Sequence, residues 1–260
     1  MAEVFRTILL GFGSLYVVLA LTGYFLSDSM MFPLPANDYS IDGLLRLPLE
    51  EGGFVEALHL VNPEARYTLL YSHGNGEDLE LILPVLKEYS RRGYSVLAYE
   101  FPGYGRSPGT TSEKSVTAAI DAAYEYLTGQ GGVASDRIVV YGRSMGSGPS
   151  TDLAAREPVG GLILEGGYVS IFRVITRLPI LPWDKFANER KLPAVRCPVF
   201  VMQAEHDEVV GYWHGPRLYS AANEPKRFWK VDGAGHNSLM TVAGDQYWRH
   251  LTECSDSLAD

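Results

Sequence analysis

Ser144 stands between two glycines in Gly142-Arg143-Ser144-Met145-Gly146, a G-x-S-x-G pattern. A serine hydroxyl can attack a carbonyl carbon when a nearby base accepts its proton. Residues 137–141, just before the pattern, are mostly β-branched and apolar, and residues 147–156 have the character of a helix. A strand, a glycine-flanked serine and a helix in this order are typical of the nucleophile elbow of a serine hydrolase. We therefore predict that Ser144 is a nucleophile; the alternative is a Gly-Ser turn without chemistry.

The base for this serine is predicted to be His236. It stands in the segment DGAGHN, residues 232–237, just past the last expected strand, and the glycines there let a loop carry an imidazole back over a sheet end. Other histidines are less well placed. His59 lies within an early strand, His214 lies in a helix-like segment, and His250 lies on a polar C-terminal helix where we expect it to face solvent.

A carboxylate must fix the tautomer of that histidine and stabilise the imidazolium. Asp207 follows the apolar strand at residues 198–204, and its short side chain can be held rigidly at a strand end. The resulting chain order, Ser144, Asp207, His236, is the order that this type of elbow uses. The acids that compete for this role are Glu165, Glu205 and Glu208.

Backbone amides must stabilise the oxyanion of a tetrahedral intermediate. One donor is expected from Met145, the residue after the nucleophile. The other is expected from Asn75, in the turn His73-Gly74-Asn75-Gly76 that follows an early strand. His73, next to this turn, is expected to have a structural hydrogen-bonding role rather than to act as a base.

Apolar runs alternate with helical segments along the chain, which predicts an α/β fold with a mostly parallel sheet covered by helices on both faces. Ligand sites in such sheets lie at the carboxyl ends of the strands, where the candidate residues fall. The expected strands are residues 54–60, 67–71, 94–101, 137–141, 162–165, 197–204 and 227–231, and the expected helices are 79–92, 112–128 and 147–156. The loop at residues 103–109 has one residue too many for a dinucleotide fingerprint, so we expect no nucleotide site there.

Composition narrows the class of protein. The chain has 22 Lys+Arg against 31 Asp+Glu and no basic stripe, which argues against nucleic acid as a partner. Cys197 and Cys254 have no metal-binding spacing and are expected to be two unrelated thiols, with one disulfide between them as the alternative. Nothing divides residues 28–260, which we expect to form one domain.

The N-terminal region is strongly apolar. Residues 8–26 carry no charge and are just long enough for a helix to cross the hydrocarbon core of a bilayer. We predict that residues 1–27 are an uncleaved membrane anchor, with a signal peptide as the alternative. Arg6 precedes the segment, so the positive-inside rule places the N-terminus in the cytoplasm and the main domain outside it. Residues 27–35 are expected to be a turn-rich connector.

Five elements in order carry a resemblance to a known family: HGNG (73–76), FPGYGRSPG (101–109), GRSMG (142–146), EHDEVV (205–210) and GAGHN (233–237). Together they resemble the α/β-hydrolase superfamily and, within it, the Bem46 and ABHD13/ABHD17-like serine hydrolases. An apolar N-terminus followed by Met31-Phe32-Pro33 is similar to the Bem46 and ABHD13-like pattern. The resemblance implies an eight-stranded sheet, a triad of Ser144, Asp207 and His236, and hydrolysis of acyl esters or thioesters without a cofactor or a metal.

One departure from the family concerns the membrane. The ABHD17-type protein depalmitoylases carry an acylated N-terminal cysteine cluster, whereas the first cysteine here is Cys197. Membrane attachment would therefore depend on the apolar segment. Protein depalmitoylation is one option among several for the substrate.

Residues 167–195 occupy the place where such folds carry a cap. The segment is apolar, and it is either an acyl-chain groove or membrane-contacting lid, or an ordinary element that packs on the core. Its apolar residues are Ile171, Ile175, Leu178, Ile180, Leu181, Trp183 and Phe186.

The sequence thus predicts a membrane-anchored serine esterase, lipase or thioesterase that acts on a small-molecule or lipid acyl substrate. The alternatives are a serine peptidase of the prolyl-oligopeptidase type and a non-catalytic scaffold that keeps the hydrolase fold.

Overall fold

A long N-terminal helix forms a unit of its own. The structure is a computed structural model that describes residues 1–32 and 39–258, and the chain divides into two compact units, Met1–Pro33 and Leu34–Asp260. Helix α1 spans Ala2–Met31, and its stretch Ala2–Phe25 is long and apolar enough to cross a membrane.

The start of the predicted connector is wrong, because α1 continues past Ser27 to Met31. No proline, which cannot continue a helix, occurs before Pro33. Residues 33–35 of that connector, which include the proline of Met31-Phe32-Pro33, lie outside the described residues.

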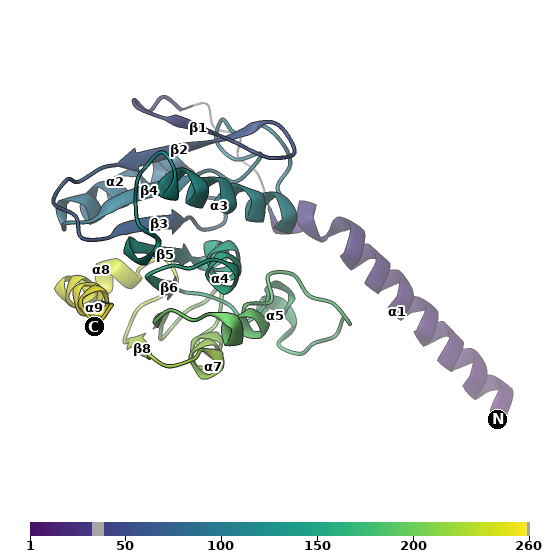
Figure 1. Ribbon diagram of the computed structural model, residues 1–260. Helices are drawn as coiled ribbons and strands as arrows, with labels where there is room; N and C mark the ends of the chain where they lie inside the picture. The colour runs from purple at the N-terminus through teal and green to yellow at the C-terminus, as the bar shows by residue number, and fades with distance from the viewer. Residues whose placement is uncertain (33–38, 259–260) are drawn as a thin grey trace. The chain divides into compact units, whose positions relative to one another are not determined.

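One eight-stranded sheet organises the larger unit, in the order β1-β2-β4-β3-β5-β6-β7-β8 (Figure 1). Strands β3 to β8 pair in parallel, whereas β2 runs antiparallel to both β1 and β4. The predicted mostly parallel sheet of eight strands is confirmed. The strands are β1 Leu45–Pro48, β2 Phe54–Leu60, β3 Thr68–Ser72, β4 Ser95–Tyr99, β5 Ile138–Arg143, β6 Gly161–Glu165, β7 Val199–Ala204 and β8 Lys226–Val231.

The sequence did not reveal β1. This short strand lies at the edge of the sheet, and Leu47 is its one buried residue. An edge strand that buries so little needs no continuous apolar run, so its pattern resembles that of a loop.

Helices cover both faces of the sheet. On one face, α2 and α9 pack against a core that is rich in tyrosine, with Tyr71 and Tyr141 stacked at 5.1 Å between ring centroids. On the other face lie α3, α4 and α7 (Figure 1). The bounds are α2 Leu79–Arg91, α3 Glu113–Thr128, α4 Ser147–Arg156, α7 His214–Ala221, α8 Leu239–Ala243 and α9 Asp245–Asp256.

The cap contains two short helices, α5 (Ile171–Thr176) and α6 (Asn188–Lys191). Its apolar side chains divide into two groups. Phe186 is fully buried, and its ring lies so close to Gly148 of α4 that a Cβ there would be 2.3 Å from it. Ile175, in contrast, is 86% exposed. Core packing therefore explains the apolar character of the cap at Phe186, whereas Ile175 remains exposed to solvent.

A buried histidine holds the start of the cap in place. His214 is inaccessible to solvent, and its Nδ1 accepts the N–H of Val169 at 3.1 Å. Burial, with the nearby charge of Arg173, lowers the pKa of His214 to about 4. The side chain is therefore neutral in the folded protein at pH values where an unfolded chain would protonate it.

Acidification should destabilise the fold through this histidine. Between its unfolded pKa of 6.5 and its folded pKa of about 4, the unfolded state binds the extra proton, so stability falls as pH falls. From pH 7 to pH 4.5 we expect His214 to account for a loss of about 2.5 kcal/mol in the free energy of unfolding. In urea titrations in neutral detergent, His214→Gln should remove that part of the pH dependence. The matched variant of exposed His206, His206→Gln, should retain the full pH dependence of the free energy of unfolding. An unchanged pH dependence in His214→Gln would refute the assignment.

Candidate active site

The serine of the G-x-S-x-G pattern sits on a strained turn. Strand β5 ends at Arg143, a single 3-10 turn covers Ser144–Gly146, and α4 follows directly. Ser144 has a φ of 49°, in the left-handed region that residues other than glycine rarely adopt. Such strain clusters at functional sites, where surrounding structure maintains it.

The flanking glycines are required by close backbone contacts. A Cβ on Gly146 would lie 2.1 Å from the carbonyl oxygen of Ser72, and a Cβ on Gly142 would lie 2.6 Å from the Cα of Ser147. Backbone atoms cannot move aside as a flexible side chain can. The turn therefore tolerates no side chain at either glycine.

The structure brings Ser144, His236 and Asp207 into one hydrogen-bonded row. The Nε2 of His236 lies 2.9 Å from the Oγ of Ser144, and the Nδ1 of His236 lies 2.8 Å from the Oδ2 of Asp207. Ser144 follows β5, Asp207 follows β7 and His236 follows β8. The carboxyl ends of these parallel strands meet at one edge of the sheet. This row can move a proton away from the serine hydroxyl and stabilise the resulting imidazolium.

Asp207 is held by more than the histidine. The side-chain amide of Gln203 donates to its Oδ2 at 2.9 Å, and the N–H groups of Val209 and Val210 donate to its Oδ1 at 3.0 and 2.7 Å. Burial by itself would raise the pKa of Asp207, but the hydrogen bonds and charge of His236 and the two amides outweigh it and lower the pKa below its ordinary value. Gln203 was not among the predicted site residues, although a polar residue on an apolar strand was a usable signal.

The three rival acids have other partners. Glu208 accepts the backbone N–H of His236 at 3.0 Å, and Glu205 pairs with Lys230 at 2.9 Å. Glu165 accepts the hydroxyl of Tyr247 at 2.8 Å.

The expectation for His250 is wrong. It is half-buried rather than solvent-facing, because its ring packs on Trp229 at 4.2 Å between centroids and its Nδ1 lies 2.8 Å from a guanidinium nitrogen of Arg227. A polar helix pattern alone does not show that α9 covers the edge strand β8.

The expected oxyanion turn lies beside the serine. Asn75 and Ser144 line the same cavity, and the side-chain oxygen of Asn75 accepts the hydroxyl of Tyr104 at 2.5 Å. Met145 follows Ser144, and its carbonyl accepts the hydroxyl of Tyr168 at 3.1 Å. Both expected donor residues are thus anchored next to the serine.

His73 is buried beneath this turn. Its Nδ1 lies 2.8 Å from the carbonyl oxygen of Gly74, and its Nε2 lies 3.5 Å from an oxygen of the buried Glu100. Burial lowers the pKa of His73, but the hydrogen bond and charge of Glu100 outweigh burial, so the net shift is upward. These contacts agree with the structural role expected from the sequence.

Arg143 connects the loops of the site, a role that was not predicted. Its Nη1 forms an ion pair with Glu77, its Nε lies 3.5 Å from Glu165, and its Nη2 donates to the side chain of Asn237 at 2.9 Å. Glu77 in turn accepts the N–H of Gly74 at 2.6 Å. One guanidinium therefore joins the end of β5, the turn at residues 73–76 and the loop after His236. The only available signal was a charged residue inside the glycine-serine motif.

A cavity of about 630 Å³ opens at the serine. Among the described residues, its lining includes none from the cap at residues 167–195, so the cap does not form the wall beside Ser144. The lining residues are Tyr71, Gly74, Asn75, Glu77, Leu81, Ile82, Val85, Arg143, Ser144, Glu165, Val209, His236, Asn237, Leu239, Met240 and Thr241.

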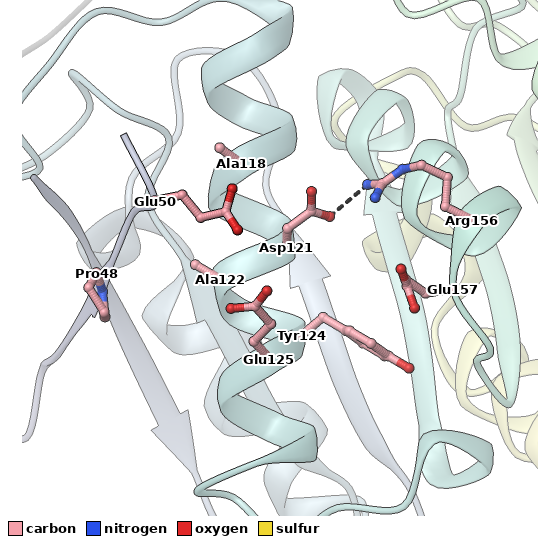
Figure 2. Close-up of a pocket in the computed structure, with 9 residues that line it drawn as sticks. All are labelled: Pro48, Glu50, Ala118, Asp121, Ala122, Tyr124, Glu125, Arg156 and Glu157. Atoms are coloured by element: carbon pink, nitrogen blue, oxygen red, sulfur yellow. Dashed lines mark hydrogen bonds and ion pairs between the residues drawn. The ribbon is translucent and has the colours of Figure 1, made fainter. Parts of the chain in front are cut away.

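A second cavity of about 260 Å³ lies beside α3, away from these residues (Figure 2). Carboxylates of Glu50 and Glu125 border it, and Asp121 points toward Arg156 with an ion pair at 2.6 Å. It contains no candidate nucleophile or base, so it is not the candidate active site.

Among residues 1–32 and 39–258, no group of three or more His, Cys, Asp or Glu side chains could hold a metal ion. Cys197 and Cys254 are both free, and burial raises the pKa of their thiols to about 12 and about 11.

Comparisons with known proteins agree on one fold. A family described as "Serine aminopeptidase, S33" matches residues 63–190. The alpha/beta hydrolase domain-containing protein aho-3 of Caenorhabditis elegans is 37% identical over 180 residues, which cover 68% of this chain and 54% of that protein. The alpha/beta hydrolase domain-containing protein 17B of Xenopus tropicalis is 36% identical over 195 residues, covering 74% of this chain and 67% of that protein. The matched region thus spans about half to two thirds of these relatives.

Solved structures show the same architecture at lower identity. An esterase of Pyrococcus furiosus superposes with a TM-score of 0.72 at 16% identity and covers 87% of this chain and 98% of its own. A monoacylglycerol lipase of Paleococcus ferrophilus superposes with a TM-score of 0.63 at 18% identity and covers 78% of this chain and 99% of its own.

Proposed function

Because the chain belongs to the α/β-hydrolase superfamily, we propose that it hydrolyses carboxylic esters or thioesters with Ser144, His236 and Asp207 as its catalytic triad. The observation that carries this proposal is the continuous row from the Ser144 hydroxyl through both ring nitrogens of His236 to the Asp207 carboxylate, at 2.9 and 2.8 Å. The left-handed φ of Ser144 supports the same assignment.

The proposed reaction has two halves. Ser144 Oγ attacks the acyl carbonyl carbon while His236 Nε2 takes its proton, and Asp207 stabilises the imidazolium. The amides of Met145 and Asn75 stabilise the oxyanion. When the tetrahedral intermediate collapses, the imidazolium returns the proton to the leaving alcohol or thiol, and an acyl-enzyme remains. Water, deprotonated by the same histidine, then releases the acid and restores the serine.

We further propose that α1 anchors the enzyme in a membrane as a single-pass helix, with the catalytic domain outside the cytoplasm. The length and apolar composition of Ala2–Phe25 support an anchor, and a signal sequence would have the same features. The placement of the domain depends on Arg6, the one basic residue before the apolar segment. The proposed substrate is a small-molecule or lipid acyl ester or thioester.

A serine peptidase is the second candidate, because the matching family is described as a serine aminopeptidase. The esterase and the peptidase candidates can be separated by comparing activity on ester substrates with activity on anilide substrates. We expect kcat/KM of the full chain in detergent to be at least about a hundredfold higher on p-nitrophenyl esters than on aminoacyl-p-nitroanilides, a difference of about 2.7 kcal/mol in activation free energy. Higher activity on the anilides would favour the peptidase. Absence of covalent labelling by a fluorophosphonate would favour a non-catalytic scaffold.

A further inference from the structure

Residues 166–168, which lead from β6 into the cap, run past the residues of the proposed triad. A Cβ on Gly166 would lie 3.1 Å from Cε1 of His236, and a Cβ on Gly167 would lie 3.3 Å from Cβ of Ser147. The segment therefore passes from the imidazole to the first turn of α4, and its last residue is a tyrosine.

The side chain of Tyr168 reaches the backbone beside Ser144. Tyr168 is 1% exposed, and its hydroxyl donates to the carbonyl oxygen of Met145 at 3.1 Å. Burial raises the pKa of Tyr168 well above its ordinary value, so the hydroxyl keeps its proton and remains a donor. Gly148 of α4 leaves space for this hydroxyl, because a Cβ there would lie 2.8 Å from the hydroxyl oxygen.

The carbonyl of Met145 has a particular need for a side-chain donor. Gly146 has helical dihedral angles, φ −59° and ψ −17°, so the helical path begins before α4. On such a path a carbonyl accepts the N–H of the residue four positions ahead, which here is Pro149 and has no N–H. The N–H of Ser147 is shared between the Met145 carbonyl and the carbonyl before it. The hydroxyl of Tyr168 therefore supplies a hydrogen bond that position 149 cannot.

The cap holds Tyr168 in place. Asn188 of α6 is fully buried, and its side-chain amide donates to the carbonyl of Tyr168 at 3.0 Å and to the hydroxyl oxygen of Ser147 at 3.2 Å. The next residue, Val169, donates its N–H to His214 at 3.1 Å. Hydrogen bonds therefore fix the backbone on both sides of the tyrosine side chain, and its hydroxyl has a defined position relative to the start of α4.

Fixing the carbonyl of Met145 also restricts its N–H, the proposed oxyanion donor. The N–H and the carbonyl of one residue belong to neighbouring rigid peptide planes, which are separated only by the φ and ψ of that residue. Donors to an oxyanion are effective when they are held in place before the charge develops, and a displacement of about 1 Å can cost about a hundredfold in rate. A hydrogen bond to the carbonyl therefore limits the directions in which the N–H can point.

We propose that Tyr168 is a positioning residue, whose hydroxyl keeps the N–H of Met145 directed at the oxyanion of the tetrahedral intermediate. This inference rests on the proposed function, because it takes Ser144 as the nucleophile and Met145 as an oxyanion donor. It also gives the base of the cap a role in the reaction, since Asn188 of α6 holds Tyr168.

A pair of ketones tests this role on the full chain in detergent. With a 1,1,1-trifluoroalkan-2-one, Ser144 Oγ bonds to the ketone carbon, its proton passes to His236 Nε2, and the carbonyl π electrons move to the oxygen, which becomes an oxyanion. The matching alkan-2-one lacks the fluorines and binds as the free ketone. The Ki of the first compound therefore reports oxyanion stabilisation, and the Ki of the second reports binding in the cavity alone.

Tyr168→Phe removes the hydroxyl and retains the buried ring. We expect kcat/KM on p-nitrophenyl acetate to fall about tenfold and the Ki of the trifluoromethyl ketone to rise about tenfold, which is less than the roughly hundred- to thousandfold loss expected when a whole oxyanion donor is removed. KM and the Ki of the alkan-2-one should change by less than about twofold. Active-site titration with a fluorophosphonate restricts each value to folded enzyme, so a loss of stability is not counted as a loss of positioning.

The matched control is Tyr124→Phe, on α3. Tyr124 is also buried and also donates its hydroxyl to a backbone carbonyl, that of Pro158, at 2.8 Å. The control should leave kcat/KM and both Ki values unchanged. The positioning role is wrong if Tyr168→Phe behaves like Tyr124→Phe, or if both ketones bind Tyr168→Phe more weakly by the same factor, which would indicate a change in the shape of the cavity.

The two proposals fail in different ways. If wild type hydrolyses the acetyl ester and binds the trifluoromethyl ketone more tightly than the alkan-2-one, but Tyr168→Phe does the same with unchanged constants, the role of Tyr168 is wrong and the triad stands. If wild type hydrolyses no ester and binds no fluorophosphonate, the proposed function itself is wrong.

Discussion

Replacing Ser144 with alanine is expected to lower kcat for ester hydrolysis by roughly four to six orders of magnitude, with little change in Tm. The alanine retains the backbone turn but removes the one oxygen that lies 2.9 Å from His236 Nε2, so no acyl-enzyme can form. Fluorophosphonate labelling followed by intact-mass measurement should show one adduct on wild type and none on Ser144→Ala. Residual hydrolysis would come from binding and the oxyanion donors alone.

The control for this experiment is Ser220→Ala on the exposed face of α7, which should label and turn over like wild type. Equal labelling of Ser144→Ala and wild type would show that another residue is the nucleophile. An inactive wild type that nevertheless folds would instead point to the scaffold alternative.

Replacing Arg143 with methionine is expected to lower kcat about a hundredfold and the stability of the fold by about 3 kcal/mol. Removing the guanidinium leaves the Glu77 and Glu165 carboxylates, both largely buried, without their counter-charge. The turn anchored through the N–H of Gly74 and the loop anchored through Asn237 would then both shift relative to the serine. A displacement of about 1 Å at a catalytic group can cost about a hundredfold in rate.

The effect of Arg143 on kcat must be distinguished from its effect on the stability of the fold. Burial by itself would lower the pKa of Arg143, but its two acidic partners raise it, so the guanidinium stays charged at every working pH. Arg143→Lys retains the charge but cannot contact all three partners, so it should recover more stability than kcat. Arg156→Met removes a cation that pairs with Asp121 away from the site, and it should leave kcat unchanged. If the folded fraction of Arg143→Met, titrated with fluorophosphonate, turns over at the wild-type rate, Arg143 is structural only.

Local signals accounted for much of the fold. Seven of the eight strands were predicted. Continuous apolar runs identified five of them, β3 to β7, because a strand buried on both faces of a parallel sheet is apolar along most of its length. Strand β1 was missed because it buries only Leu47. The end of α1 was placed too early, at Ser27, although no proline stops the helix before residue 33.

The triad candidates were also accessible to local reasoning. Ser144 stands between glycines at a strand–helix junction, and His236 and Asp207 each follow a strand, so their order and positions at strand ends could be read directly. The glycines were informative because backbone contacts as close as 2.1 Å exclude any side chain. Chain order could not decide between Asp207 and the neighbouring acids, since all of them lie near strand ends.

The sequence by itself thus determined a serine at an elbow, a histidine and a set of acids on one edge of a parallel sheet, because each depends on short-range pattern. The predicted contact of Asp207 with the imidazole is seen only in the tertiary structure. Tertiary structure alone decided that Arg143 joins Glu77, Glu165 and Asn237, and that α2 and α8 rather than the cap line the cavity at Ser144. The physical reason is distance along the chain. Arg143 and Glu77 are 66 positions apart, and such a contact depends on how strands are ordered in the sheet, which no local pattern encodes.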